Sequence, residues 1–217
     1  MKRESLAKIH SLLLQWGKDN FRYYPWRETK DPYKILIAEI LLHRTRADQV
    51  VPLYQKFTLR FPTIRAIVEA DIDEIKELLA SAGLFWRIDL IYRMAQDIES
   101  DFNGRIPEDK QDLLSLPGVG NYIASAIRCF AWNHPEILVD TNTVRITGRI
   151  FGTKVNDGSR RQKQFLLKME ELLDRENPAD FNFALLDLGS KICLSREPLC
   201  EKCPISSFCK SAFQKKI

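Results

Sequence analysis

The feature that most constrains the fold of this 217-residue chain is the helical spacing of its apolar residues. Leucine, isoleucine and aromatic residues recur at three- and four-residue intervals in long stretches that proline, glycine or asparagine interrupt. These stretches are Leu6–Lys18, Tyr33–Phe61, Thr63–Ala80, Ile88–Phe102, Asp109–Leu114, Tyr122–Trp132, Thr141–Phe151, Gln162–Arg175 and Phe181–Cys193. No segment alternates between apolar and polar residues for long enough to predict a strand. The sequence therefore predicts an all-α protein.

Composition predicts a folded chain that does not enter a membrane. Apolar residues make up 45% of the sequence, enough for a hydrophobic core, and no apolar run reaches the roughly 18 residues of a membrane span. The start, MKRESLAKIHSLLLQW, places charges within a helical pattern and lacks the apolar region of a signal peptide. We expect a cytoplasmic monomer. The net charge of +4 permits a polyanionic partner without requiring one, so a binding face would be local.

Turn-forming residues divide the predicted helices into two lobes. The segments GRIPED, WNHPEILVDT and ENPAD mark helix ends, and the chain around His134 and Pro135 is typical of a crossing between lobes. We expect one helical domain at residues 25–133. A second helical domain would combine residues 1–24 with residues 134–217.

Four of the five cysteines lie close together near the C-terminus, with the spacing C-x6-C-x2-C-x5-C. They are Cys193, Cys200, Cys203 and Cys209. In a reducing compartment this pattern predicts a metal site before disulfides. Structural zinc usually uses two tight cysteine pairs, and this run has one, so an iron–sulfur cluster is favoured over zinc. Four unrelated buried cysteines are the remaining alternative.

The sequence LPGVG, from Leu116 to Gly120, predicts a tight turn directly before a helix. Gly118 and Gly120 allow positive φ and leave the backbone without side chains. The amides of such a turn and of a helix N-terminus form a positively polarised site that fits a phosphate, which makes Leu116, Gly118, Val119 and Gly120 candidate residues of such a site. An ordinary glycine turn between two packed helices is the alternative, because short glycine motifs occur often.

Glu39 and Asp140 are candidate catalytic carboxylates. Glu39 lies among apolar residues in KILIAEILL, where loss of solvation would raise its pKa toward that of a general acid. It could equally face a groove or pair with Arg44 or Arg46. Asp140 directly precedes the predicted helix 141–151, and on local sequence alone it is a helix N-cap.

Cations and aromatic residues gather at two further helix ends. HRTRADQ contains His43, Arg44 and Arg46, and GLFWR contains Leu84 and Arg87. Such groups can bind phosphates or wedge into a base stack, although a charged helix end is often only solvated surface. We include His43, Arg44, Arg46 and Leu84 as candidate contacts to DNA.

In their order along the chain, these motifs resemble those of the helix-hairpin-helix DNA glycosylases of the endonuclease III superfamily. LPGVG resembles the hairpin, LVDTNTVRITGR resembles the segment with the family's aspartate, and the cysteine spacing is similar to that of its 4Fe–4S loop. The similarity runs from about Leu12 to Cys209. It implies two helical lobes with a DNA cleft between them, a nucleoid-associated location, and roles for Asp140 in stabilising a cationic sugar and for Glu39 in assisting the departing base.

Within that superfamily, YPWRETKDPYKILIAEILLHRT is similar to the adenine glycosylase MutY and, more closely, to the archaeal thymine–DNA mismatch glycosylases. Tyr122 stands where endonuclease III has its Schiff-base lysine and MutY has serine, as in the mismatch glycosylases. The chain ends eight residues after Cys209, which we take to exclude the further domain of MutY.

The resemblance therefore implies a monofunctional glycosylase that removes thymine, and uracil, opposite guanine in double-stranded DNA, with Tyr122 at the site and weak or no lyase activity. A short MutY-type adenine glycosylase is the alternative enzyme. A noncatalytic protein that binds DNA structure is the alternative from another class.

Overall fold

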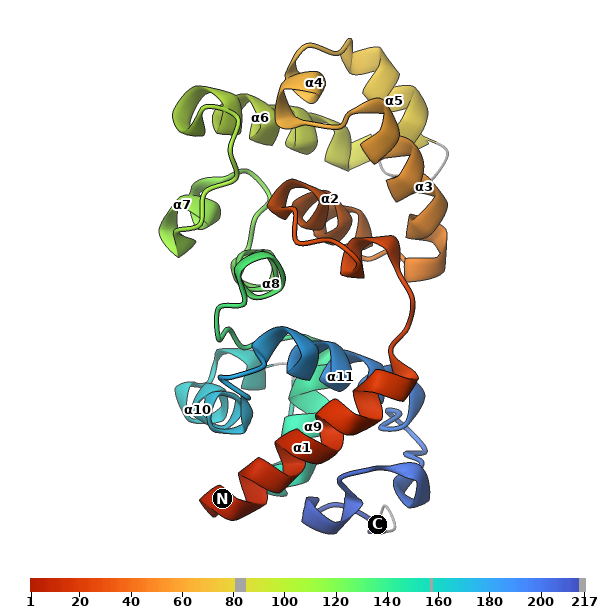
Figure 1. Ribbon diagram of the computed structural model, residues 1–217, viewed down its shortest axis with the longest axis vertical. Coiled ribbons are helices and arrows are strands. Elements are labelled where there is room, and N and C mark those ends of the chain that lie inside the picture. Colours follow the sequence, from red (N-terminus) through yellow and green to blue (C-terminus); the bar gives the residue numbers. More distant parts are fainter. Residues whose placement is uncertain (81–84, 157, 215–217) are drawn as a thin grey trace. The chain divides into compact units, whose positions relative to one another are not determined.

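Helices make up the ordered secondary structure of the residues that the computed structural model describes, 1–80, 85–156 and 158–214 (Figure 1). These residues form eleven α-helices and four short 3-10 helices, and no strand occurs among them. The all-α prediction is therefore confirmed. None of the described helices is both long enough and apolar enough to cross a membrane.

The chain divides into two compact units. The terminal unit consists of residues 1–22 and 133–217, and the central unit consists of residues 23–132. The helices of the central unit are η1 (Pro25–Arg27), α2 (Pro32–Leu42), α3 (Ala47–Arg60), α4 (Ile64–Val68), α5 (Ile72–Ala80), α6 (Phe85–Phe102), α7 (Lys110–Ser115) and α8 (Asn121–Trp132). Those of the terminal unit are α1 (Arg3–Asn20), α9 (Thr141–Phe151), η2 (Ser159–Arg161), α10 (Lys163–Leu172), α11 (Pro178–Lys191), η3 (Cys200–Lys202) and η4 (Ser206–Phe208).

The central unit is built around α2. Its sequence PYKILIAEILL is apolar on nearly every side, and eight of its eleven residues are buried, as expected for a helix surrounded by others. Asp31 starts the helix by accepting a hydrogen bond from the amide of Tyr33 (3.0 Å), and Pro32 occupies the first turn. Helices α3 and α8 pack against it.

Two of the predicted helical stretches are each divided in the structure. The stretch 33–61 is interrupted at residues 43–46, where Arg44 has a left-handed φ of 62° and no proline or glycine marks the break. The stretch 63–80 is divided between α4 and α5, where the Asp71 side chain accepts a hydrogen bond from the amide of Asp73 (2.9 Å). Apolar periodicity continues through the second break, and the first break carries neither proline nor glycine, so the pattern revealed neither of them.

The terminal unit joins the first helix to the last third of the chain. α1 packs alongside α11, and α9 packs on α11 and α10 (Figure 1). The core of this unit contains, among others, Ile9, Leu13, Ile146, Ile150, Phe181, Ala184, Leu185, Leu188 and Ile205.

Helix α11 also fixes both places where the chain passes between the units. The carboxylate of Asp187 is fully buried and accepts two hydrogen bonds from Arg22, one from the backbone amide (2.8 Å) and one from Nε (2.5 Å). The side-chain amide of Asn182 donates to the carbonyl of Glu136 (3.0 Å) on the returning segment. Hydrogen bonds to a charged group contribute about 1.5–3 kcal/mol each, so the Arg22–Asp187 contact is a strong anchor.

Candidate functional site

The LPGVG segment forms the predicted turn between α7 and α8. Gly118 has a φ of 79°, and a β-carbon at this position would run into the side chain of Leu90, so the conformation requires glycine. The amide of Val119 donates to the carbonyl of Leu116 (3.1 Å) and closes the turn. Gly120 is exposed, and a β-carbon there would meet open space, so its backbone is accessible to a ligand.

Leu116 and Val119 face the interior of the central unit. Their side chains are 3% and 5% exposed, so any contact that these residues make with DNA would involve the backbone. The amide of Val119 is engaged inside the turn, and the DNA contacts of Leu116 and Val119 stay predictions. The exposed backbone of Gly118 and Gly120 and the N-terminus of α8 form the remaining candidate surface for a phosphate, because the first turn of a helix leaves amides without intrahelical acceptors.

Tyr122 lies half-buried in the first turn of α8, two residues beyond Gly120. Ser125, which is on the same helix face one turn later, is buried and accepts a hydrogen bond from Nζ of Lys110 on α7 (3.1 Å). This bond ties α7 to α8 on the face that carries Tyr122.

Asp140 caps α9 in the terminal unit, as the sequence predicted. Its Oδ1 accepts a hydrogen bond from the amide of Thr143 (2.7 Å), and the Thr143 hydroxyl accepts one from the amide of Asp140 (3.0 Å), which completes a capping box. Its Oδ2 accepts a hydrogen bond from Nδ2 of Asn142 (3.1 Å). The half-exposed carboxylate is therefore held in one orientation at the positively polarised end of a helix.

Two arginines of α9 connect this helix to the segment that carries the first cysteine of the cluster. Nη2 of Arg145 donates to Oδ1 of Asn142 (2.8 Å) and to the carbonyl of Gly189 (2.8 Å), and its Nε donates to the carbonyl of Cys193 (2.9 Å). Nη1 of Arg149, one turn later, donates to the sulfur of Cys193 (3.2 Å). Sequence reasoning missed both arginines, although their spacing of four in VRITGR placed them on one helix face.

Glu39 and the cationic turn lie in the central unit, separately from Asp140. Glu39 is buried in α2 with 7% of its surface exposed. His43, Arg44 and Arg46 are exposed in the turn that follows α2, as a contact surface for a polyanion would require. Partial desolvation, followed by the charges of Arg87 and Arg44, lowers the pKa of His43 from its ordinary value and so favours the neutral imidazole.

Arg87 is not a surface cation, contrary to the interpretation of GLFWR. Its side chain is 1% exposed and donates to the carbonyl of Leu41 (2.7 Å) and to the hydroxyl of Thr45 (3.2 Å). The interpretation of Arg87 as a surface cation that binds a phosphate is therefore wrong. Leu84, the other candidate in that segment, lies outside the described residues.

The four clustered cysteines converge on one small cavity of about 30 Å³, and all are free thiols. Burial, together with the proximity of the other three cysteines, raises the pKa of Cys203 to about 11. Nη1 of Arg149 donates to the carbonyl of Leu194 (2.6 Å) beside this cavity. Thus the loop is fixed to α9 at its first cysteine.

The geometry of these thiols bears on what they could bind. Among the described residues, no three histidine, cysteine or acidic side chains are arranged around a single metal ion. The four thiols do share one cavity, and thiolate sulfur is a ligand of both zinc and iron–sulfur clusters.

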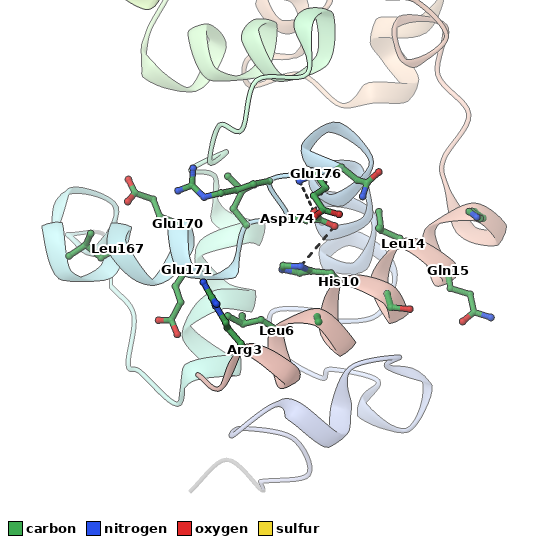
Figure 2. Close-up of a pocket in the computed structure, with 16 residues that line it drawn as sticks. Arg3, Leu6, His10, Leu14, Gln15, Leu167, Glu170, Glu171, Asp174 and Glu176 are labelled. Carbon is green, nitrogen blue, oxygen red and sulfur yellow. Dashed lines mark hydrogen bonds and ion pairs between the residues drawn. The ribbon is translucent and has the colours of Figure 1, made fainter.

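A larger groove of about 1290 Å³ lies elsewhere in the terminal unit, between α1 and α10 (Figure 2). Its lining includes Glu170, Glu171 and Asp174, and it contains none of the predicted catalytic or DNA-contacting residues. Figure 2 shows His10 directed toward Asp174, with Nδ1 4.0 Å from Oδ2. The lining also includes Arg3, Lys18 and Arg175, so carboxylates and cations are mixed along this groove.

Known proteins resemble this chain over nearly its whole length. Residues 37–172 match the family described as HhH-GPD superfamily base excision DNA repair protein. The thymine-DNA glycosylase of Aeropyrum pernix is 39% identical over 216 residues, which cover 94% of each protein. The thymine/uracil-DNA glycosylase of Methanothermobacter thermautotrophicus is 36% identical, over 93% of this chain and 91% of that protein.

Two further similarities concern structure and a second activity. The structure of a thermostable thymine-DNA glycosylase superposes with a TM-score of 0.90 and 34% identity, covering 96% of this chain and 97% of that chain. An adenine DNA glycosylase of Buchnera aphidicola is 34% identical over 89% of this chain, which spans 55% of that protein.

The capping geometry of Asp140 predicts different effects of two substitutions on stability. Asp140→Asn should leave the free energy of unfolding within about 0.5 kcal/mol of the unsubstituted protein, because asparagine caps helices as well as aspartate does. Asp140→Ala should lower it by about 1 kcal/mol, because the Thr143 amide loses its acceptor. Urea denaturation of the three proteins measures both values. Equal losses in the two variants would contradict the capping role.

Proposed function

This chain belongs to the HhH-GPD superfamily of base excision DNA repair proteins, and we propose that it is a DNA glycosylase that excises thymine, and uracil, from mismatches with guanine. The observation that carries the proposal is the fixed Asp140 carboxylate at the start of α9, in a chain that superposes on a thymine-DNA glycosylase over 96% of its length. The match to the family also confirms the resemblance recognised in the motifs.

Binding would begin at the turn between α7 and α8. The exposed Gly118 and Gly120 backbone and the α8 N-terminus suit a DNA phosphate, and His43, Arg44 and Arg46 supply further polar contacts. Such contacts position the protein on the duplex without reading its sequence. The target base would be rotated out of the duplex, which costs less free energy at a mismatch than at a regular pair.

Asp140 would stabilise the sugar as the N-glycosidic bond breaks. The electron pair of that bond leaves with the base, so C1′ becomes cationic and the pyrimidine becomes anionic. A carboxylate held by Thr143 and Asn142 needs no reorganisation to face this cation. Water then adds to C1′ and loses a proton, which leaves an abasic strand.

Glu39 would act on the departing base. Glu39 is buried in α2, and its protonated form would donate a hydrogen bond to the departing base. A protonated Glu39 can therefore support a thymine or uracil anion, whereas a charged one would repel it.

Tyr122 would give the enzyme hydrolytic chemistry without strand cleavage. A lysine amine at this position could attack C1′ and form a Schiff base, which leads to β-elimination. A phenol cannot form that imine, so the product of this enzyme would be an intact abasic strand.

Adenine is the alternative substrate, favoured by the 34% identity to an adenine DNA glycosylase. The higher identity and fuller coverage of the thymine-directed relatives favour thymine. The glycosylase relatives argue against the alternative from another class, a protein that binds mismatched duplexes without excision.

We also propose that Cys193, Cys200, Cys203 and Cys209 hold a 4Fe–4S cluster. The shared cavity and the free thiols support this assignment. The bound cluster would supply the interior that this loop otherwise lacks, since only Ile205 of the loop is fully buried. Arg145 and Arg149 would hold the loop against α9, and thus against the helix that Asp140 caps.

The substrate assignment is tested with duplexes that contain G·T, G·U, A·8-oxoguanine, A·G or thymine glycol. We expect release of thymine from G·T and of uracil from G·U, measured as strand breakage after hot alkali. Asp140→Asn should slow single-turnover excision by about 100-fold or more, because it removes the charge that faces the sugar cation. Its affinity for the G·T duplex should stay within about tenfold. Release of adenine would favour the alternative enzyme, and tight binding without any release would favour the noncatalytic protein.

The cluster assignment is tested by metal analysis of anaerobically purified protein. We expect about four iron and four sulfide per chain and a yellow-brown colour. Cys203→Ser should lose the iron and become less soluble, whereas Cys129→Ala, which alters a buried cysteine of the central unit, should keep it. A colourless protein with stoichiometric zinc would contradict the assignment.

The role of Tyr122 is tested by borohydride trapping on a G·U duplex. The unsubstituted protein should form no covalent complex, because its phenol is not an amine. Tyr122→Lys should gain trapping and some strand cleavage, and Tyr122→Phe should gain neither. Efficient cleavage by the unsubstituted protein would overturn the monofunctional assignment.

A further inference from the structure

The turn between α2 and α3 holds an exposed arginine in an unfavourable backbone conformation. Arg44 has a φ of 62°, which side-chain-bearing residues rarely adopt. Its neighbours His43 and Arg46 are also exposed, so the three side chains project from one short segment. A conformation of this kind persists only where the surrounding structure enforces it.

Arg87 supplies that enforcement from inside the unit. Nη1 of Arg87 donates to the carbonyl of Leu41 (2.7 Å), which precedes the turn, and Nη2 donates to the hydroxyl of Thr45 (3.2 Å), which follows Arg44. The amide of Thr45 also donates to the carbonyl of Leu42 (3.1 Å). One guanidinium thus joins the two ends of the strained segment.

The burial of Arg87 makes this arrangement rigid. The side chain is 1% exposed and comes from α6, a separate helix of the same unit. Moving the guanidinium would leave charged donors in an apolar interior, which is costly, so both bonds are strongly favoured. The planar fork of arginine reaches two acceptors at a fixed separation, whereas the single ammonium of lysine cannot reproduce that geometry.

We propose that Arg87 is a positioning residue that holds the 43–46 turn, and through it Arg44, in the conformation that contacts DNA. The proposal rests on the proposed function in that it takes the ligand to be a duplex. Arg87 itself does not touch the ligand. Its contribution is to remove the conformational freedom that the exposed arginine would otherwise lose on binding.

Four variants separate positioning from stability. Arg87→Met keeps the aliphatic volume and removes both donors. Thr45→Val removes only the hydroxyl that accepts from Nη2 and keeps the shape of the side chain. Arg44→Ala removes the exposed side chain that Arg87 is proposed to position. Tyr33→Phe is the matched control, because it deletes a buried hydrogen bond to the carbonyl of Phe61 in the same unit, away from the turn.

The measurements are the dissociation constant for a G·T duplex in an Asp140→Asn background, and hydrogen exchange of the peptide that spans the turn. We expect Arg87→Met to weaken binding about tenfold and Thr45→Val about threefold, both with faster exchange in the turn. Tyr33→Phe should change neither. On an Arg44→Ala background, Arg87→Met should lose most of its effect, because the two residues act as a unit.

Three results would overturn the proposal. The first is that the losses of DNA affinity caused by Arg44→Ala and Arg87→Met add fully in the double variant. The second is that Tyr33→Phe loses as much affinity as Arg87→Met. The third is that Thr45→Val changes neither the affinity nor the hydrogen exchange of the turn. Thr45→Val keeps the test valid if Arg87→Met does not fold. Failure of the proposed function is distinguishable, because the unsubstituted protein would then release no base from the G·T duplex, whereas failure of this proposal leaves that activity intact.

Discussion

The constraint on which the rest of this structure depends is the burial of one helix in each unit, α2 in the central unit and α11 in the terminal unit. A helix surrounded by other helices must satisfy every polar group that it carries within the protein, because no water is available. On α11, Asp187 accepts a hydrogen bond from Arg22, and Asn182 donates one to the carbonyl of Glu136. The two segments that leave and re-enter the terminal unit are therefore both held by α11. On α2 the buried carboxylate is Glu39, at a position where a charged residue is rarely found.

The polar residues of α9 serve both folding and the proposed chemistry. The hydrogen bonds that hold the Asp140 carboxylate are those of an ordinary helix cap, and they also fix the carboxylate as electrostatic catalysis requires. Asn142 and Arg145 extend this network to Gly189 and Cys193. The orientation of the carboxylate and the attachment of the cysteine loop are therefore parts of one network of hydrogen bonds.

The proposed DNA contacts are backbone and surface groups, and the groove between α1 and α10 is not among them. Proteins contact the phosphates of a duplex through exposed amides and cations, whereas a deep pocket suits a small ligand. The groove beside α1 carries carboxylates, and its interior polar groups hold the helices together, as His10 does through the Leu172 carbonyl (2.9 Å). The candidate site is therefore defined by exposed amides, exposed cations and a fixed carboxylate, and not by the size of a groove.

The sequence by itself determined the features that depend on neighbouring residues. Apolar periodicity predicted the helices, the glycine at 118 predicted the turn, Asp140 predicted a cap, and the cysteine spacing predicted a shared site. Each is decided within one or two helical turns, so local sequence is enough. Only the tertiary structure decided that the 33–61 stretch breaks at Arg44, that Leu116 and Val119 point inward, and that Arg87 is buried. The direction of a side chain and the stability of a strained turn depend on partners distant in the chain, and for Arg87 those partners are Leu41 and Thr45 on another helix and its turn.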